Sequence, residues 1–280
     1  MKLKEIYQEL KQSLLNEEAQ IEARIILQNV LNIDNSELIT NEEQELTRNQ
    51  IKTIFEIRDK RNKEKIPLAY LLEEAVFCGH RFFVNSDVLI PRPETELLVT
   101  KILEEIKSRR ISKPTILDLG TGSGCIANSL KLALPAARVL ASDISRASLN
   151  VAYINAKRLK AEIEFIMGDF LDPILGVSSS PIAVPVMTGK PPYFDIIVSN
   201  PPYISEADYQ NLAAELFHEP KHALVGFPYA HIKNQAKGLL YPNGFMAFEF
   251  GLGQSDKLLE IFPKAKIYPD LAGIDRVLVV

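Results

Sequence analysis

Four short segments of this sequence, each following an apolar run, carry residues that could do chemistry. The first is the turn Gly120–Gly124, which reads Gly-Thr-Gly-Ser-Gly after the apolar residues 115–119. Glycines let the backbone adopt positive φ and pass close to a ligand. The spacing is G-x-G-x-G and no Lys-Ser/Thr pair follows, which disfavours both a pyrophosphate-binding dinucleotide turn and a Walker loop. The turn therefore predicts a ligand that needs no diphosphate.

Acidic residues follow the next two apolar runs. Asp143 comes directly after residues 138–142, where a carboxylate could accept both hydroxyls of a ribose. Asp169 and Phe170 come after residues 164–167, where an acid could meet an adenine amine and a ring could contact the base. Each of these alone could be a tight turn or a solvated acid. Three in succession indicate an adenosine ligand, and S-adenosylmethionine is the leading candidate cofactor.

The fourth segment is Asn200–Tyr203, Asn-Pro-Pro-Tyr, directly after the apolar residues 194–199. Two prolines stiffen the backbone and remove two amide donors. The Asn200 side-chain oxygen and the Pro201 carbonyl could then accept both N–H groups of a planar –NH2, while Tyr203 offers a flat face. This would orient the nitrogen lone pair towards a methyl donor, and positioning is the main catalytic resource of a direct transfer. An isolated Asn-Pro-Pro-Tyr is usually a turn, so its place after the fourth run favours the catalytic interpretation.

The predicted site residues form two overlapping groups. Those predicted to bind the cofactor are Gly120, Thr121, Gly122, Ser123, Gly124, Asp143, Asp169, Phe170 and Asn200. Those predicted to act on the methyl acceptor are Asn200, Pro201, Pro202 and Tyr203. This chemistry needs no metal, and we predict no metal site. Residues 218–222 match H-E-x-x-H, the zinc metalloprotease pattern, but Pro220 would disrupt the helix that must carry both histidines.

Strands that alternate with helices must position these segments. The apolar runs predict strands at residues 115–119, 138–142, 164–167, 194–199, 245–250 and 276–280, and helices at residues 126–134 and 145–159. Such alternation is typical of a mostly parallel sheet that is covered on both faces. Ligands of these folds bind at the carboxyl ends of the strands. We therefore predict an α/β, doubly wound architecture.

The first 66 residues are built differently from the rest. All 13 Gly and 17 Pro lie from Pro67 onwards, whereas 24 of the first 66 residues are charged. Apolar residues recur at helical spacing in residues 3–14 and 23–31 and less regularly in 46–58, and Thr40–Glu43 fits a capping box. We predict a small bundle of three or more helices, either a stabilising appendage or a partner-binding module.

The predicted domains are residues 1–66, the helical substrate-recognition domain, residues 67–92, a linker with a β-hairpin, and residues 93–280, the catalytic domain. Residues 60–65 are expected to be a charged, solvated linker. The hairpin is expected within residues 77–90, and Pro91–Glu96 is expected to open a helix. The domain roles rest on the resemblance described below.

Bulk composition limits the partners and the compartment. The chain has 280 residues, a formal net charge of −4 and 46% hydrophobic residues, which indicates a globular protein and argues weakly against nonspecific nucleic-acid binding. No apolar run approaches the roughly 20 residues of a membrane span, and no signal peptide is expected. Cys78 and Cys125 are too few for a disulfide framework. We predict a cytoplasmic protein with reduced thiols.

These motifs resemble those of a known family. The Gly120–Gly124 turn, Asp143 and Asn200–Tyr203 look like those of class I S-adenosylmethionine methyltransferases that act on a planar amino group. Residues 67–70, 88–96 and 270–276 extend the resemblance over nearly the whole chain, to the release-factor glutamine N5-methyltransferases of the PrmC/HemK family. The sequence departs from the family pattern at Glu73, where a glycine is usual, and at residues 174–193, a longer loop that we hypothesise to be a mobile flap.

The resemblance implies a mostly parallel seven-stranded sheet, S-adenosyl-L-methionine as cofactor and a peptide chain release factor as partner. The methyl acceptor would be the side-chain nitrogen of the glutamine in its Gly-Gly-Gln motif, and residues 1–66 would help to hold that protein. No membrane partner is expected. The alternative is N6-adenine methylation of nucleic acid, since those enzymes share Asn-Pro-Pro-Tyr, but the sequence shows no basic region with interleaved aromatics. A helical adaptor on an inactive methyltransferase fold is a third hypothesis.

Overall fold

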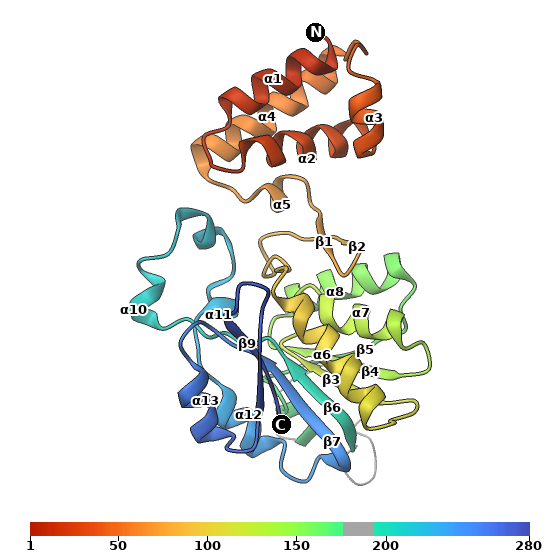
Figure 1. The fold of residues 1–280 in the computed structure, drawn as a ribbon, viewed down its shortest axis with the longest axis vertical. Coiled ribbons are helices and arrows are strands. Elements are labelled where there is room, and N and C mark those ends of the chain that lie inside the picture. The colour runs from red at the N-terminus through yellow and green to blue at the C-terminus, as the bar shows by residue number, and fades with distance from the viewer. Residues whose placement is uncertain (176–192) are drawn as a thin grey trace. The chain divides into compact units, whose positions relative to one another are not determined.

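The computed structural model describes residues 1–175 and 193–280, which form two compact units (Figure 1). The helical unit comprises Met1–Glu74 and Ala213–His218, and the sheet unit comprises Ala75–Leu212 and Glu219–Val280. The hypothesis of a flap at residues 174–193 lies outside the described residues, apart from the two ends of that loop. The domain boundaries after residues 66 and 92 remain predictions.

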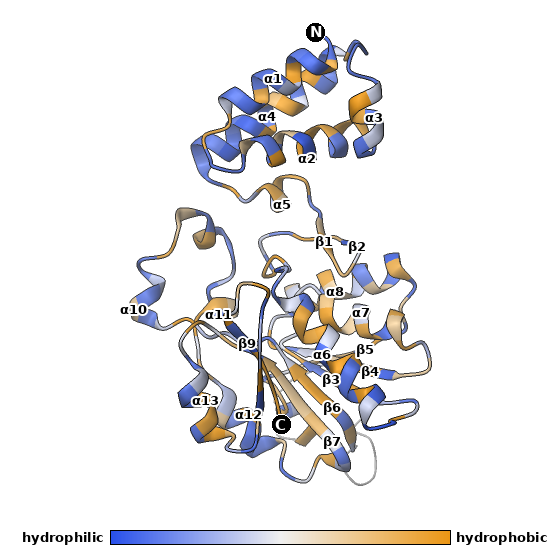
Figure 2. Cartoon of the chain, viewed as in Figure 1, coloured by the Kyte–Doolittle hydropathy of each residue, from blue (hydrophilic) through white to orange (hydrophobic). Residues whose placement is uncertain are grey.

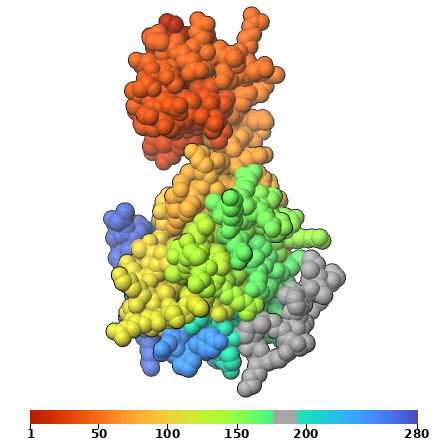
Figure 3. Space-filling model, turned by 90° about the vertical axis from the view of Figure 1, so that its right-hand side faces the viewer, coloured from red at the N-terminus to blue at the C-terminus, as the bar shows by residue number. Residues whose placement is uncertain are grey.

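The helical unit is a bundle whose helices share one apolar core. Its elements are α1 (Leu3–Ser13), α2 (Ala19–Leu31), α3 (Asn35–Thr40), α4 (Arg48–Glu64), the short α5 (Leu68–Leu71) and the 3-10 helix η1 (Ala214–His218). Leu3, Ile6 and Leu10 of α1 are buried against Ile26 of α2 and Ile54 of α4. Figure 3 shows α1 to α4, in red and orange, as a closely packed body.

Two expectations for the helical unit are wrong. Residues Thr40–Glu43 do not start a helix: α3 ends at Thr40, and the capping box of α4 is formed by Thr47 with Gln50, since Gln reaches back as well as Glu. Residues 60–65 are not a solvated linker, because all but Lys65 belong to α4 and Arg61 is buried. The charged run is misleading there, because one of its charges, Arg61, is paired with the buried Glu22 and with the partly exposed Glu215.

The sheet unit is built around seven strands in the order β5-β4-β3-β6-β7-β9-β8. The strands are β3 (Thr115–Leu119), β4 (Arg138–Asp143), β5 (Glu164–Met167), β6 (Phe194–Ser199), β7 (Leu240–Glu249), β8 (Lys266–Pro269) and β9 (Asp275–Val279). The five strands from β5 to β7 pair in parallel, whereas β9 pairs antiparallel with β7 and β8. This confirms the predicted mostly parallel seven-stranded sheet.

Helices cover both faces of the sheet, because side chains of each strand alternate between two cores. Ile116 of β3 packs in one core with α6 (Thr95–Ser108) and α7 (Cys125–Ala133), and Leu117 packs in the other with α12 (Tyr229–Gln235) and α13 (Ser255–Ile261). The central strands are correspondingly apolar along their length (Figure 2). The remaining helices are α8 (Arg146–Leu159), α9 (Asp172–Leu175), α10 (Glu206–Tyr209) and α11 (Lys221–Leu224). The doubly wound prediction is therefore confirmed.

The hairpin is shorter than predicted. It pairs β1 (Ala75–Phe77) with β2 (His80–Phe82) across a two-residue turn, Cys78 and Gly79, both at positive φ. Pairing stops after Phe82 because the Asn155 side chain of α8 takes both backbone groups of Phe83, at 2.7 and 2.9 Å. None of the helices in the described ranges is both long and apolar enough to cross a membrane.

Candidate active site

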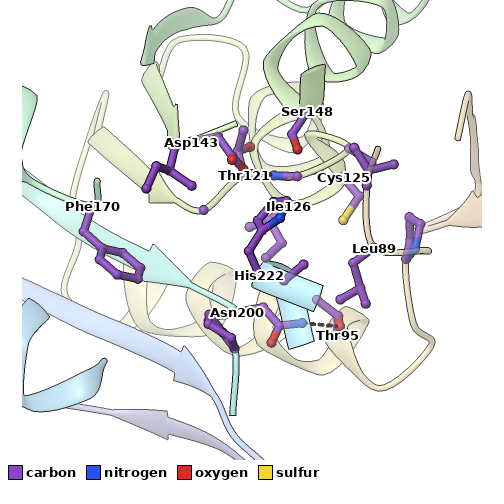
Figure 4. A pocket seen from close by; sticks show the side chains of 18 of the residues that line it. Leu89, Thr95, Thr121, Cys125, Ile126, Asp143, Ser148, Phe170, Asn200 and His222 are labelled. Atoms are coloured by element: carbon purple, nitrogen blue, oxygen red, sulfur yellow. Dashed lines mark hydrogen bonds between the residues drawn. The ribbon is translucent and has the colours of Figure 1, made fainter. Parts of the chain in front are cut away.

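A cavity of about 220 Å³ lies where β3, β4, β5 and β6 end in the sheet unit (Figure 4). The strand order reverses between β3 and β6, which is where open α/β sheets bind ligands. Nine of the predicted residues line the cavity: Gly120, Thr121, Gly122, Ser123, Asp143, Asp169, Phe170, Asn200 and Pro202. Gly124, Pro201 and Tyr203 do not belong to its lining.

The glycine turn leaves room on the cavity side. Gly120 and Gly122 have φ of 66° and 54°, and a Cβ added at either would meet nothing within 4 Å. A Cβ at Gly124 would instead come within 2.8 Å of Asn128 Nδ2, so this glycine serves the packing of α7. Gly120 and Gly122 thus leave space for a ligand that lies against the turn. Gly124 lets α7 start directly after the turn.

A buried acid stabilises the turn from below. The Thr121 hydroxyl donates to Asp118 Oδ2 at 2.6 Å, while Asp118 Oδ1 is buried without a partner among the described atoms. Burial raises the pKa of Asp118 to about 7, although the bond from Thr121 lowers it. The end of β3 therefore holds a carboxyl group that is poorly satisfied beside the cavity, which is common at functional sites.

Asp143 ties the glycine turn to the end of β4. Its Oδ2 accepts from the Gly122 N–H and its Oδ1 from the Ser145 N–H, both at 2.9 Å. The carboxylate is 7% exposed, and burial raises its pKa while these bonds oppose the rise. Each oxygen keeps a further lone pair. The arrangement fits two neighbouring hydroxyl groups, as a ribose would present them.

Phe170 and Asp169 form the wall that follows β5. Phe170 has φ of 40°, a conformation that costs a bulky residue about 1 kcal/mol or more. Its carbonyl accepts from the Ser142 hydroxyl at 3.3 Å, and its ring meets His231 edge-on at 6.3 Å between centroids. The strained backbone is thus held from two sides with its ring at the cavity (Figure 4). Asp169 is exposed beside it.

The Asn200 amide has one end occupied. Its Nδ2 donates to Thr95 Oγ1 at 3.3 Å, which leaves Oδ1 as the end free to accept at the cavity (Figure 4). Thr95 is the first residue of α6 and is buried. A side-chain amide that must accept from a substrate –NH2 needs this orientation, because its own –NH2 would repel that group.

Tyr203 lies outside the cavity lining, next to the end of β7. Its hydroxyl donates to Glu249 Oε1 at 3.4 Å, and a Cβ at Gly251 would come within 2.9 Å of its ring. Burial raises the pKa of the Tyr203 hydroxyl, so it stays neutral. The structure therefore brings Asn200 and Pro202 to the cavity and places Tyr203 behind them.

Several residues of the cavity wall are missing from the sequence-based set. Thr95 and Arg92 line it, and Arg92 is paired with Glu219, whose other oxygen accepts from the Ile90 N–H at 3.0 Å. The only sequence signal for Thr95 and Arg92 is the resemblance of residues 88–96, which by itself predicts no more than a helix start. Glu219 belongs to the H-E-x-x-H match, so its residue pattern suggests a metal site and not a buried partner for Arg92.

The H-E-x-x-H match does not form one helix. His218 ends η1, Pro220 caps α11, and His222 lines the cavity. Among residues 1–175 and 193–280, no three His, Cys, Asp or Glu side chains are grouped to hold a metal ion.

Two family models and many relatives match the chain. Residues 75–226 match the model "Methyltransferase small domain", and residues 2–72 match the "PrmC N-terminal domain". A release factor glutamine methyltransferase of Bacillus cereus is 37% identical, over 97% of either chain. The protein of the same name from Chlorobaculum tepidum is also 37% identical, over 93% of this chain and 89% of its own.

Solved structures support the fold. The 16S rRNA N2 G1207 methyltransferase of T. Thermophilus, in complex with AdoMet and guanosine, superposes with a TM-score of 0.52 at 18% identity, over 74% of this chain and 49% of that one. This similarity extends to the fold alone. The sequence similarity to these relatives spans both the sheet unit and the helical unit. The chain therefore belongs to the release factor glutamine methyltransferase family.

Proposed function

We propose that this protein transfers a methyl group from S-adenosyl-L-methionine to the side-chain amide nitrogen of the glutamine in the Gly-Gly-Gln motif of peptide chain release factors. One observation carries the proposal beyond family membership. The Asn200 amide is held by Thr95 with its oxygen free at the cavity, beside a glycine turn and an acid that suit an adenosine. The site for the cofactor and the site for the glutamine amide that accepts the methyl group thus adjoin each other.

The cofactor supplies, when bound, a methyl group on a sulfonium that an amide nitrogen can attack. Gly120 and Gly122 would let it lie against the turn, and Asp143 would accept from its ribose hydroxyls. Phe170 would contact the adenine and Asp169 its amine. The open Cβ positions of the two glycines are the observation on which this fit rests.

The acceptor amide would be positioned by hydrogen-bond acceptors. The Asn200 Oδ1 at the cavity would accept one N–H group, and the Pro201 carbonyl, next in the chain although outside the cavity lining, would accept the other. This turns the nitrogen lone pair towards the methyl group. Prolines cannot donate, so the segment offers no competing N–H at these positions. Pro202 at the cavity would pack against the flat amide, with Tyr203 behind it. Holding the two reactants in line is the catalytic contribution of these residues.

The helical unit would recognise the release factor. It exposes apolar side chains at Leu15, Ile21 and Ile25, and the last two are one helical turn apart on α2. Residues 1–66 carry 11 basic and 13 acidic residues, which suits a protein partner better than nucleic acid. Because the substrate would be a translation factor, we propose a cytoplasmic location.

Incubation with labelled cofactor would test the proposal. The full chain is offered release factor, release factor with its Gly-Gly-Gln glutamine changed to alanine, or duplex DNA. We expect label on the first only. Label on DNA alone would favour N6-adenine methylation, and label on none, despite cofactor binding, would favour the adaptor hypothesis.

A further inference from the structure

Glu249, at the end of β7, is a buried acid with an unmet hydrogen-bonding capacity. It is 2% exposed, and its buried Oε2 makes no hydrogen bond of normal length and angle among the described atoms. Its Oε1 accepts from the Tyr203 hydroxyl at 3.4 Å, and its backbone carbonyl accepts from the Tyr229 hydroxyl at 2.8 Å. A buried acid that is only partly satisfied costs stability, so it needs a functional reason.

The same carboxylate faces the residue that orients Asn200. The Thr95 hydroxyl is near enough to Glu249 to favour the charged form of the acid, as the Tyr203 hydroxyl does. The Thr95 oxygen accepts from Asn200 Nδ2 at 3.3 Å, so the single Thr95 proton points elsewhere. A charged carboxylate can only accept hydrogen bonds, so it attracts the Thr95 hydroxyl proton, and the Thr95 oxygen is left to accept from Asn200 Nδ2. A protonated Glu249 could instead donate to the Thr95 oxygen. The Thr95 hydroxyl proton would then point at Asn200 and attract its Oδ1 in place of Nδ2.

We propose that Glu249 is a positioning residue, which fixes the acceptor orientation of the Asn200 amide through Thr95 and holds Tyr203 behind the acceptor site. The inference rests on the proposed function, because it assumes that Asn200 accepts from a substrate –NH2. Both polar side chains of the Asn-Pro-Pro-Tyr segment are then set by one acid, which touches neither substrate nor cofactor.

This role makes the charge of Glu249 matter. Its pKa is raised to about 7, chiefly by burial and in part by Glu94, against the opposing effects of Thr95, Tyr203 and Arg276. Tyr229 also faces it and stays neutral, because burial raises the pKa of its hydroxyl. The acid is thus charged above about pH 7 and neutral below it. The rate of transfer at saturating substrates should rise with pH through this range.

The test compares Glu249→Gln with the wild-type full chain on release factor. Glutamine keeps the shape but offers either an oxygen or an –NH2 to Thr95, so we expect kcat to fall about 10- to 100-fold. The dissociation constant of the cofactor should not change, and kcat should lose its rise near pH 7. Glu105→Gln is the matched control: it lies on α6 with Thr95, but arginine pairing lowers its pKa, so it should keep the rise.

A double-variant cycle tests the route through Thr95. If Glu249 acts through that hydroxyl, adding Thr95→Val to Glu249→Gln should cost far less than Thr95→Val costs in the wild type. Thr95→Ser, which keeps the hydroxyl, should restore most of kcat. A wild-type kcat and pH profile in Glu249→Gln, or additive losses in the cycle, would overturn the inference. Should Glu249→Gln not fold, a wild-type kcat in Thr95→Val would overturn it equally.

Failure of the proposed function looks different. It would show in the wild type, as absence of label on release factor. The same variants would then be compared on the acceptor that the wild type does methylate, duplex DNA first, since Asn200 would hold an adenine amine in the same orientation.

Discussion

The two units of the molecule differ in how some of their buried polar side chains are satisfied. In the helical unit, Arg61 donates to Glu22 through Nε and Nη2 at 2.8–3.1 Å and to Glu215 through Nη1 at 2.6 Å. In the sheet unit, four buried side chains each keep one polar atom without a partner among the described atoms: Asp118, Asn128, Ser129 and Glu249. The helical unit has one such atom, on Asn16.

This difference suggests that the helical unit is built for stability and that the sheet unit gives up some stability for chemistry. A buried polar atom without a partner costs about 1–3 kcal/mol, so a unit that only had to fold would lose such atoms. Asp118 lies under the glycine turn and Glu249 behind the acceptor site, which are the two parts of the cavity that chemistry would use. The helical unit, whose buried Arg61 and Glu22 are paired, has the character of a scaffold that presents a surface. The predictions that follow test this contrast, beginning with the largest expected effect.

Removing one member of the buried Arg61–Glu22 ion pair should harm folding and leave chemistry intact. Arg61→Met leaves Glu22 buried without its partner, which should lower the free energy of unfolding by about 3–5 kcal/mol. Urea unfolding of the full chain measures this. Arg61→Met combined with Glu22→Met is the matched control, because it removes both charges and should recover most of the loss. A loss below about 1 kcal/mol in the single variant would contradict the scaffold interpretation.

Removing the acceptor amide should harm chemistry and leave folding intact. Asn200→Ala should lower kcat about 100- to 1000-fold, the usual cost of deleting one oriented hydrogen-bonding group at a reacting centre. Equilibrium binding of the cofactor should change little beyond the loss of the contact that Asn200 itself makes. Asn243→Ala, an exposed residue at the other end of the sheet, is the control and should behave as wild type. Near-normal turnover in Asn200→Ala would refute its role.

Asp143 should affect the cofactor more than the acceptor. Asp143→Ala removes a charged acceptor and frees the Gly122 N–H, so the dissociation constant of the cofactor should rise about 10- to 100-fold. Asp143→Asn keeps one acceptor oxygen and should lie between the alanine variant and the wild type. Isothermal titration gives the constants directly. An unchanged constant in Asp143→Ala would show the ribose assignment to be wrong.

The smallest effect should come from the surface of the helical unit. Ile21→Lys with Ile25→Lys should raise KM for intact release factor about tenfold, because exposed apolar contacts of this size contribute roughly 1–2 kcal/mol. The same variant should methylate a short Gly-Gly-Gln peptide as the wild type does. Equal effects on peptide and protein would argue that the helical unit does not recognise the partner.

Much of the sheet unit could be predicted because its signals are local. Short apolar runs with polar residues at their ends give parallel strands whose carboxyl ends meet, and so the sequence alone assigns Gly120, Asp143 and Asn200 to one edge of the sheet. The structure brings them to one cavity. Their roles in binding and transfer remain predictions.

The missed parts depend on pairing between distant segments. Glu219 lies more than a hundred residues from Arg92, and nothing in the local pattern of either links them. The charged neighbours of Arg61 in the sequence predict a solvated side chain. Its carboxylate partners are remote in sequence, so the local pattern does not indicate them. The residue type of Tyr203 predicts a contact with the methyl-accepting amide. Whether Tyr203 reaches the cavity, however, depends on how closely the end of β7 approaches this tyrosine. Turn positions are also hard to predict: Glu73 adopts φ of 52°, where a glycine would be less strained.

The membership of Ala213–His218 in the helical unit has a consequence for biosynthesis. Arg61 meets Glu22 as soon as the first helices leave the ribosome, but Glu215 is made 154 residues later. At usual rates of translation that is a delay on the order of 10 s. During this time the nascent bundle carries a guanidinium with only one of its two carboxylates, and it is completed only after β6 has been synthesised. The first part of the chain to emerge is therefore among the last to be finished.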